Sequence, residues 1–257
     1  MAKNIRLTIE YKGTSFAGWQ FQPEQATVQG EIEEAIQKTT GHRVTLIGAG
    51  RTDAGVHALA QVANFKIDHP LEASRYRDAL NYYLPRDIHV TGAVEAPSAF
   101  HARFDATWRH YRYIIGAERS AIYRELRWET AGLLRRSDLS KAAAMIRGEH
   151  DFSPFCVSSS LKENNRCTIT HSAWSEAGPL LIYDIRGDRF LHGMVRSLVG
   201  AMVNAAAEQQ DNNMLNLTLE DFRNTLEGSR TDRIAFTAPA HGLYLVAVGY
   251  PTEGNQE

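Results

Sequence analysis

Alternation of apolar and polar residues predicts strands along the first hundred residues. Residues 5–11 alternate throughout, which is typical of a strand with one buried face. The same criterion predicts three further strands, at residues 43–47, 61–67 and 88–94. Apolar residues at helical spacing predict two helices, at residues 28–40 and 73–84. Thr27 is the expected N-cap of the first helix and Gly41 its expected end. This order of strands and helices predicts an α+β fold, with helices packed on one face of an antiparallel sheet.

The second part of the chain is predicted to follow a similar order of elements. Strands are expected at residues 107–115, 168–175, 180–186 and 243–250, and a hairpin turn at Gly178 joins the second and third. Helices are expected after Ser137 or Asp138, from about Phe190, and over residues 217–226 with Thr218 as the cap. His150 and Asp151 are predicted to form a turn, and residues 157–165 an exposed, mobile loop. We therefore expect two similar halves, residues 1–105 and residues 106–250, and a disordered tail over residues 251–257.

Composition narrows the functional classes. The chain has 257 residues, of which 43% are hydrophobic and 23% charged, as in an ordinary folded protein with a substantial core. The formal net charge is only −2, yet residues 101–136 contain eight arginines and four acidic residues. A basic stripe on a nearly neutral protein is suited to binding a polyanion.

Cysteines, histidines and the N-terminus point to a cytoplasmic protein without a metal. The two cysteines, Cys156 and Cys167, are expected to be free thiols in a reducing compartment. Neither they nor the ten histidines follow a metal-binding spacing. The N-terminus has no apolar signal segment, and no apolar run is long enough to span a membrane.

Residues 48–58 contain the strongest candidate for chemistry. Three glycines surround Arg51 and Asp53 in a stretch that joins two predicted strands, so the Asp53 carboxylate is expected on an exposed turn. Two other interpretations stay open at this point. In the first, the stretch is a structural turn in which Asp53 only caps backbone amides. In the second, the glycines bind a phosphate, although neither standard phosphate-loop spacing is present.

The strand over residues 107–115 carries an unusual mixture of side chains. Alternation places Arg109, Tyr111 and Tyr113 on one face, and His110, Arg112 and Ile114 on the other. Guanidinium groups suit phosphates and aromatic rings suit unstacked bases. The alternative is that both tyrosines are core residues with satisfied hydroxyls.

Arg196 follows Val195 on the apolar side of a predicted helix. A buried guanidinium needs an anion, since an unpaired buried charge is costly. The alternative is that its side chain reaches solvent.

These motifs together resemble the bacterial tRNA pseudouridine synthase A (TruA) family. The matching strings run in order along nearly the whole chain: Tyr11-Lys12-Gly13-Thr14, residues 48–58, Leu80-Asn81, Leu84-Pro85, residues 100–104, Tyr111-Arg112-Tyr113, residues 150–153, Met194-Val195-Arg196, residues 198–200 and residues 242–245. Small departures are Ala60, where the family usually has glycine, and a longer polar stretch over residues 208–216.

The resemblance implies both a fold and an activity. The fold would be a long, mixed, mostly antiparallel sheet with flanking helices, arranged as two similar halves around a basic cleft. The activity would be isomerisation of uridine to pseudouridine at positions 38, 39 and 40 of the tRNA anticodon stem-loop. The resemblance further implies a homodimer that needs no cofactor, metal or protein partner.

The resemblance also assigns roles to individual residues. Asp53 would be the catalytic nucleophile, and Tyr111 would stack on the target base. Arg196 would pair with the aspartate, Leu243 would form an apolar platform and Arg51 would help to displace the target nucleotide. From the strand pattern, Arg109 and Arg112 are added as substrate-binding residues.

Two other classes of protein compete with this interpretation. A non-catalytic RNA chaperone would need Arg109, Arg112 and the tyrosines but not Asp53. A carboxylate-dependent hydrolase would need a second acidic residue beside Asp53, and the sequence offers no obvious one.

Overall fold

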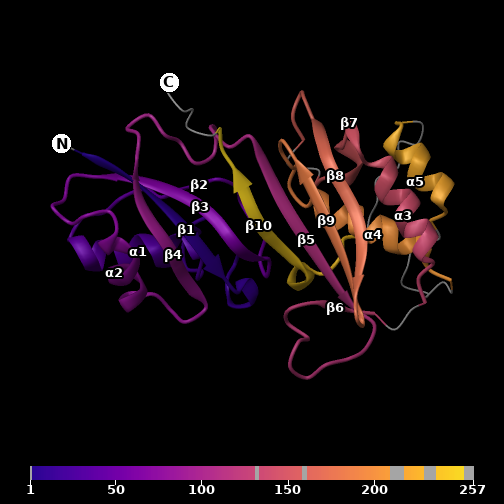
Figure 1. Cartoon of the computed structure of the whole chain (residues 1–257), viewed down its shortest axis with the longest axis horizontal. Coiled ribbons are helices and arrows are strands. Elements are labelled where there is room, and N and C mark those ends of the chain that lie inside the picture. Colours follow the sequence, from indigo (N-terminus) through magenta and orange to yellow (C-terminus); the bar gives the residue numbers. More distant parts are fainter. Residues whose placement is uncertain (1, 131–132, 158–160, 209–216, 229–235, 252–257) are drawn as a thin grey trace. The chain divides into compact units, whose positions relative to one another are not determined.

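The computed structural model describes residues 2–130, 133–157, 161–208, 217–228 and 236–251 (Figure 1). The chain divides into two compact units, each described by itself below. The first unit comprises Met1–Thr107 and Tyr244–Glu257, and the second comprises Trp108–Leu243. Ten strands and five α-helices occur among the described residues, which confirms the predicted α+β class.

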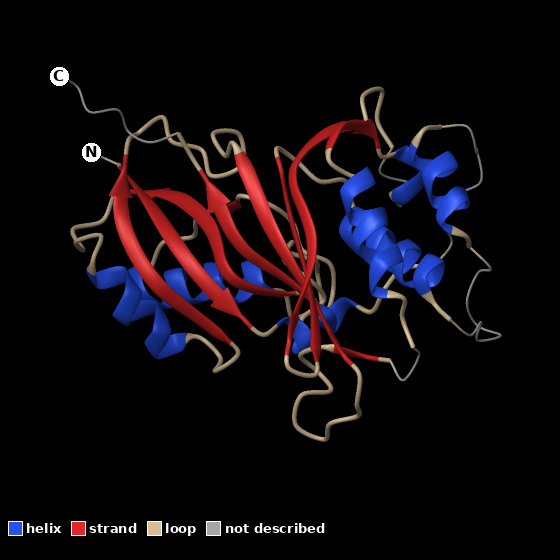
Figure 2. Ribbon diagram, turned by 45° about the vertical axis from the view of Figure 1, so that its right-hand side comes forward, coloured by secondary structure: helices blue, strands red, loops and turns tan. Residues whose placement is uncertain are grey.

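The first unit is a sheet with two helices on one face (Figures 1 and 2). Its elements are β1 (Lys3–Tyr11), α1 (Val28–Thr40), β2 (Ile47–Gly48), β3 (His57–Ile67), α2 (Arg75–Tyr83), β4 (Ile88–Ala96) and β10 (Leu243–Gly249), apart from the first residue of β10, Leu243, which belongs to the second unit. β1 lies between β4 and β3 and is antiparallel to both, β2 is antiparallel to β3, and β10 is parallel to β3. The strand β10 follows the second unit in the sequence but belongs to the sheet of the first unit.

Most of the local predictions for the first unit are confirmed. Ile5, Leu7 and Ile9 on β1 are fully buried, as the alternation predicts. The Thr27 side chain accepts a hydrogen bond from the Gly30 amide at 3.2 Å and caps α1, and Gly41 ends it with φ 78°.

The strand predicted at residues 43–47 is wrong except for its last residue, which begins the two-residue strand β2. Side chains of α1 take the place of a neighbouring strand as hydrogen-bond partners of the Leu46 backbone. Its amide donates to Oε1 of Glu33 at 2.8 Å, and its carbonyl accepts from Nε2 of Gln29 at 3.3 Å. Because its backbone hydrogen bonds are made by helix side chains, this apolar segment needs no strand partner and forms a loop beside α1.

The second unit combines an antiparallel sheet with a three-helix cluster. Its elements are β5 (Trp108–Gly116), β6 (Trp128–Glu129), α3 (Arg136–Met145), β7 (Gly148–Asp151), β8 (Arg166–Ala177), β9 (Leu180–Gly187), α4 (Met194–Ala206) and α5 (Leu219–Leu226). β5, β9, β8 and β7 pair in that order with antiparallel neighbours, and β6 pairs parallel to β5. The helices α3, α4 and α5 contact one another, and α3 also packs on β8.

Several predictions for the second unit need correction. The turn predicted at His150 and Asp151 is the end of strand β7, paired with β8. The helix predicted from Phe190 begins at Met194, because Gly193 adopts a left-handed φ of 73° that interrupts the helix. The hairpin is confirmed, with Gly178 at φ 58°, and Thr218 caps α5 as predicted.

Some predictions fall wholly or partly outside the described residues. These are part of the loop at 157–165, the stretch over 209–216 and the tail beyond residue 251. Within the described part of that loop, Asn165 is buried rather than exposed. Its side chain accepts from the Lys162 amide and donates to the Lys162 carbonyl.

Candidate active site

Asp53 lies in the loop between β2 and β3 of the first unit. It is half-buried, and Arg51 beside it is exposed. Thr52 between them is 7% exposed, and its hydroxyl lies 2.7 Å from the Tyr11 hydroxyl on β1. The Thr52 carbonyl accepts from the Trp19 amide at 3.0 Å. The residue before the candidate carboxylate is thus fixed through both its side chain and its backbone.

Strand β3 and the turn after β1 brace the same loop. The buried Gln61 side chain donates from Nε2 to the Gly50 carbonyl at 2.9 Å. The Gly13 amide donates to Nδ1 of His57, which is 1% exposed, at 2.9 Å. A loop held at several points keeps a catalytic side chain in one orientation, which is what a preorganised site requires.

The supporting roles of these residues were not predicted. Tyr11 was predicted as part of a strand and as the first residue of a family-like string, without a role of its own. For Gln61, a polar residue at the start of an alternating strand was the one signal in the sequence. The contacts of Gln61 and His57 depend on which segments meet in three dimensions, which a single sequence does not give.

Tyr111 and Tyr113 on β5 belong to the second unit and have different environments. Tyr111 is 8% exposed, and its ring lies edge-on to Phe190, with centroids 5.1 Å apart. Tyr113 is fully buried, and its hydroxyl donates to the Pro239 carbonyl at 2.8 Å. Burial raises the pKa of Tyr113 well above its ordinary value, although the charge of Arg196 acts in the opposite direction. For Tyr113, the interpretation as a satisfied core residue is therefore correct.

Arg196 and Leu243 also lie in the second unit. The Arg196 side chain is half-buried on α4, and its Nε donates to the Ala238 carbonyl at 2.8 Å. The Arg196 carbonyl accepts from the Ala238 amide at 3.1 Å. This double contact holds the start of α4 against the segment that leads to Leu243, which is 6% exposed. Asp53 and Arg51 belong to the first unit, so the pairing of Asp53 with Arg196 stays a prediction.

The two predicted phosphate-binding arginines of β5 are held differently. Nη1 of Arg109 donates to the Asp188 carbonyl at 2.8 Å. Arg112 binds the Asp184 carboxylate with two nitrogens, at 3.0 and 3.2 Å, and His110 Nε2 lies 2.7 Å from the same carboxylate. Burial alone would raise the pKa of Asp184, but the hydrogen bonds from His110 and Arg112 outweigh it and hold that pKa below its ordinary value. To bind a phosphate of the substrate, Arg112 would either do so while still bound to Asp184 or release Asp184 first.

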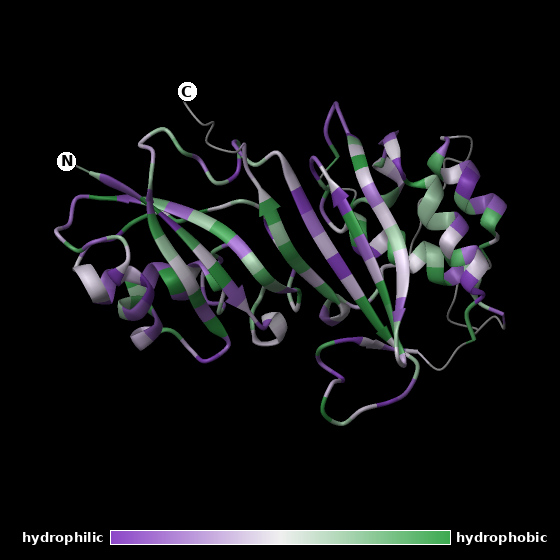
Figure 3. Cartoon of the chain, viewed as in Figure 1, coloured by the Kyte–Doolittle hydropathy of each residue, from purple (hydrophilic) through white to green (hydrophobic). Residues whose placement is uncertain are grey.

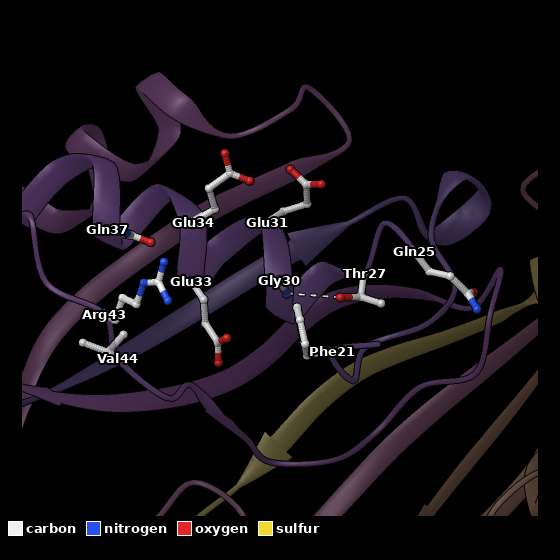
Figure 4. Close-up of a pocket in the computed structure, with 10 residues that line it drawn as sticks. All are labelled: Phe21, Gln25, Thr27, Gly30, Glu31, Glu33, Glu34, Gln37, Arg43 and Val44. Atoms are coloured by element: carbon white, nitrogen blue, oxygen red, sulfur yellow. Dashed lines mark hydrogen bonds between the residues drawn. The ribbon is translucent and has the colours of Figure 1, made fainter. Parts of the chain in front are cut away.

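A hollow of about 350 Å³ lies along α1 in the first unit, away from the predicted site residues (Figure 4). Its lining includes Glu31, Glu33 and Glu34, and Arg43 on the facing segment. The Glu33 carboxylate binds the Leu46 amide and Glu34 pairs with Lys38, so these acids already serve the local structure. An acidic hollow repels phosphate, and we assign no ligand to it.

Within the described part of the chain, no group of three or more histidine, cysteine or acidic side chains is placed to hold a metal ion. Over the same residues, no helix is both long and apolar enough to cross a membrane. Most of β10 is hydrophobic, but it is a short strand of the sheet (Figure 3).

The fold is thus that of an α+β protein with a carboxylate held on a braced loop. The chain matches the model of the family described as "tRNA pseudouridine synthase" over residues 7–105 and 142–251. A relative named tRNA pseudouridine synthase A from Pelodictyon phaeoclathratiforme is 42% identical over 250 residues, covering 96% of this chain and 100% of the relative. A second relative of that name, from Rippkaea orientalis, is 38% identical over 251 residues, covering 96% of this chain and 83% of the relative.

Among solved structures, a Cbf5-Nop10-Gar1 complex is 12% identical, with a TM-score of 0.34 over 77% of this chain and 54% of that chain, a similarity too low to inform the fold. The family match and the curated relatives are decisive. The chain belongs to the tRNA pseudouridine synthase family and is therefore an enzyme of the isomerase class.

Proposed function

We propose that this enzyme isomerises uridine to pseudouridine at positions 38, 39 and 40 of the tRNA anticodon stem-loop, with Asp53 as the nucleophile. The observation that supports this most directly is the loop itself. Asp53 lies within the first segment matched by the family model, on a loop that Tyr11, Gln61 and Trp19 hold by hydrogen bonds. Such support is expected around a reacting carboxylate.

The proposed chemistry needs only groups that the chain supplies. The N1–C1′ bond of the uridine breaks, the uracil turns over, and C5 joins C1′. The proton lost from C5 is balanced by a proton gained at N1. No electrons are transferred to another molecule, so the reaction is balanced within the nucleotide. An ionised Asp53 would attack covalently or remove a proton. A neighbouring arginine would favour the ionised carboxylate, which is the role proposed for Arg196.

The remaining residues would bind and position the flipped nucleotide. Removing a base from its stack costs a few kcal/mol, which stacking on an aromatic ring and phosphate contacts offset. We propose that Tyr111 stacks on the target base, that Leu243 supports it and that Arg51 helps to displace it. Arg109 and Arg112 are proposed as phosphate contacts. We also propose that the enzyme is cytoplasmic and acts as a homodimer that requires no other protein.

Pseudouridine mapping on an unmodified tRNA transcript, with excess chelator, tests the proposal. Wild type should modify positions 38–40, and Asp53→Ala should abolish turnover while tRNA affinity stays within a few-fold, since phosphate contacts dominate binding. Glu72→Ala is a matched control, because it removes an exposed carboxylate from the same unit and should keep wild-type activity.

The outcomes separate the competing functions. Tight binding without pseudouridine from any variant would favour an RNA chaperone. Equal activity of wild type and Asp53→Ala would show that Asp53 is not the nucleophile.

A further inference from the structure

An exposed aromatic ring stands on a tightly closed turn in the first unit. The turn spans residues 101–105, after β4. The Asp105 amide donates to the His101 carbonyl at 3.1 Å, and the His101 amide donates to Oδ2 of Asp105 at 2.9 Å. Nδ1 of His101 accepts from the amides of Arg103 and Phe104, both at 3.2 Å. Four hydrogen bonds within five residues fix the backbone that carries the ring.

The turn is also anchored to the sheet. Ala102 is fully buried, and its amide donates to Oδ1 of Asn64 on β3 at 2.8 Å. Its carbonyl accepts from the Tyr250 hydroxyl at 2.7 Å. Asn64 in turn donates to the Asn4 side chain on β1. The turn is therefore hydrogen-bonded to β3, the strand that directly follows the Asp53 loop.

Phe104 projects from this anchored turn into solvent. Phe104 is 78% exposed, although burying a phenylalanine side chain ordinarily stabilises a protein. One face of the ring stacks on the His101 ring, with centroids 4.3 Å apart and 27° between the planes. The Arg103 guanidinium lies 6.0 Å from the ring centroid. The result is a rigid platform of an aromatic ring with a cation beside it.

This combination favours RNA over other ligands. A nucleobase stacks on an exposed aromatic ring, and a guanidinium binds the phosphate that accompanies each base. Because His101 accepts two amides at Nδ1, its neutral form carries the proton at Nε2, which makes Nε2 a further hydrogen-bond donor. An apolar partner would use the ring but would gain nothing from a guanidinium charge beside it.

We propose that the turn at His101, Arg103 and Phe104 is an RNA-binding subsite, in which Phe104 stacks on an unpaired base of the substrate and Arg103 contacts an adjacent phosphate. The subsite rests on the proposed function, because it serves binding of the same RNA. It is separate from the roles assigned to Tyr111 and Arg51.

Binding of an unmodified tRNA transcript at several salt concentrations tests the subsite. Phe104→Ala should weaken binding at least about five-fold and leave the salt dependence unchanged, because stacking is not electrostatic. Arg103→Ala should lower the slope of log K against log salt by about 1. Phe104→Trp should retain affinity, and its added fluorescence should be quenched by RNA. Tyr82→Ala is the matched control: Tyr82 is 81% exposed in the same unit and lies edge-on to Tyr83, so its removal should change nothing.

Three results would overturn the subsite. The first is that Phe104→Ala binds RNA as tightly as wild type, in a preparation in which wild type forms pseudouridine. The second is an unquenched Phe104→Trp. The third is a changed sedimentation coefficient of free Phe104→Ala, which would make the turn a contact between protein chains. If wild type forms no pseudouridine but Phe104→Ala still weakens RNA binding, the proposed function fails and the subsite stands.

Discussion

Gly48, at the start of the Asp53 loop, is a position where one added methyl group should disturb the braced loop. A Cβ at this residue would lie 2.6 to 2.7 Å from three ring atoms of Trp19, far closer than carbon atoms normally approach. The Trp19 ring is 2% exposed, and its backbone donates to the Thr52 carbonyl and accepts from the Gln29 amide. The ring therefore cannot move away without disturbing the loop.

The magnitude of the Gly48→Ala effect follows from two opposing contributions. Overpacking of this kind costs about 1–3 kcal/mol. Replacing glycine by alanine also restricts the unfolded chain, which stabilises the protein by about 0.4–1 kcal/mol. The difference between the two ranges is a net destabilisation of about 0–2.6 kcal/mol, with a midpoint of ~1.3 kcal/mol. Turnover should fall as well, because any shift at Gly48 is transmitted along the loop toward Asp53.

Urea unfolding and single-turnover pseudouridine formation measure the two effects. Gly92→Ala is the matched control, since a Cβ at this glycine in β4 lies 3.9 Å from Thr8, an ordinary contact. It should be as stable as wild type or slightly more stable. In a Trp19→Leu background, which removes the ring, Gly48→Ala should cost little further stability. Equal stabilities of Gly48→Ala and Gly92→Ala would refute the packing argument.

Two further predictions concern the partners of Asp184 and Gly50. Asp184→Asn should destabilise the protein by about 1–3 kcal/mol at pH 7, because the hydrogen bonds from Arg112 and His110 lose their charged acceptor. The pKa of Asp184 is lowered in the folded protein, so its carboxylate contributes full stability only above its ordinary pKa of 3.8. This contribution is lost as the pH falls through the lower folded pKa. The difference in unfolding free energy between wild type and Asp184→Asn, measured by urea unfolding, should therefore decrease below pH 3.8. Asp78→Asn, which breaks an exposed pair with Arg77, should leave the stability almost unchanged. A pH-independent stability difference for Asp184→Asn would contradict the electrostatic explanation. Gln61→Met should lower turnover while tRNA affinity stays constant, because the bond to the Gly50 carbonyl is lost. Its stability should change by less than about 1 kcal/mol, since Oε1 of Gln61 is buried without a hydrogen-bond partner among the described residues; unchanged single-turnover rates would remove Gln61 from the support of the loop.

Local sequence signals predicted the elements that depend on neighbouring residues. Alternation located β1, the Thr27 cap located α1, and Gly178 located the hairpin, because each rests on contacts within a few residues. The loop that carries Asp53 was also found from its glycines. These features come from backbone conformation and short-range hydrogen bonding, which a single sequence encodes directly.

Contacts between distant residues account for what sequence missed. The predicted strand at residues 43–47 is mostly a loop because the Glu33 side chain captures the Leu46 amide thirteen residues away. Arg112 was expected to face phosphates, but its carboxylate partner Asp184 lies 72 residues further along the chain. The Gln61 bond to Gly50 depends likewise on two segments meeting in the folded sheet. Periodicity contains no information about such partners.

The pairing of β10 with β3 affects how the chain completes its fold during synthesis. The second unit is continuous, from Trp108 to Leu243, whereas the first unit needs the strand that follows it. Until Tyr244 and Leu245 leave the ribosome, the edge of β3 beside His57 and Ala58 lacks its parallel partner. An unpaired strand edge is a site of aggregation, and domains completed late expose it longest. The sheet that carries the Asp53 loop is therefore completed by a strand that is translated after the whole second unit. A chain that stops before residue 244 lacks the parallel partner of β3, the strand that follows that loop.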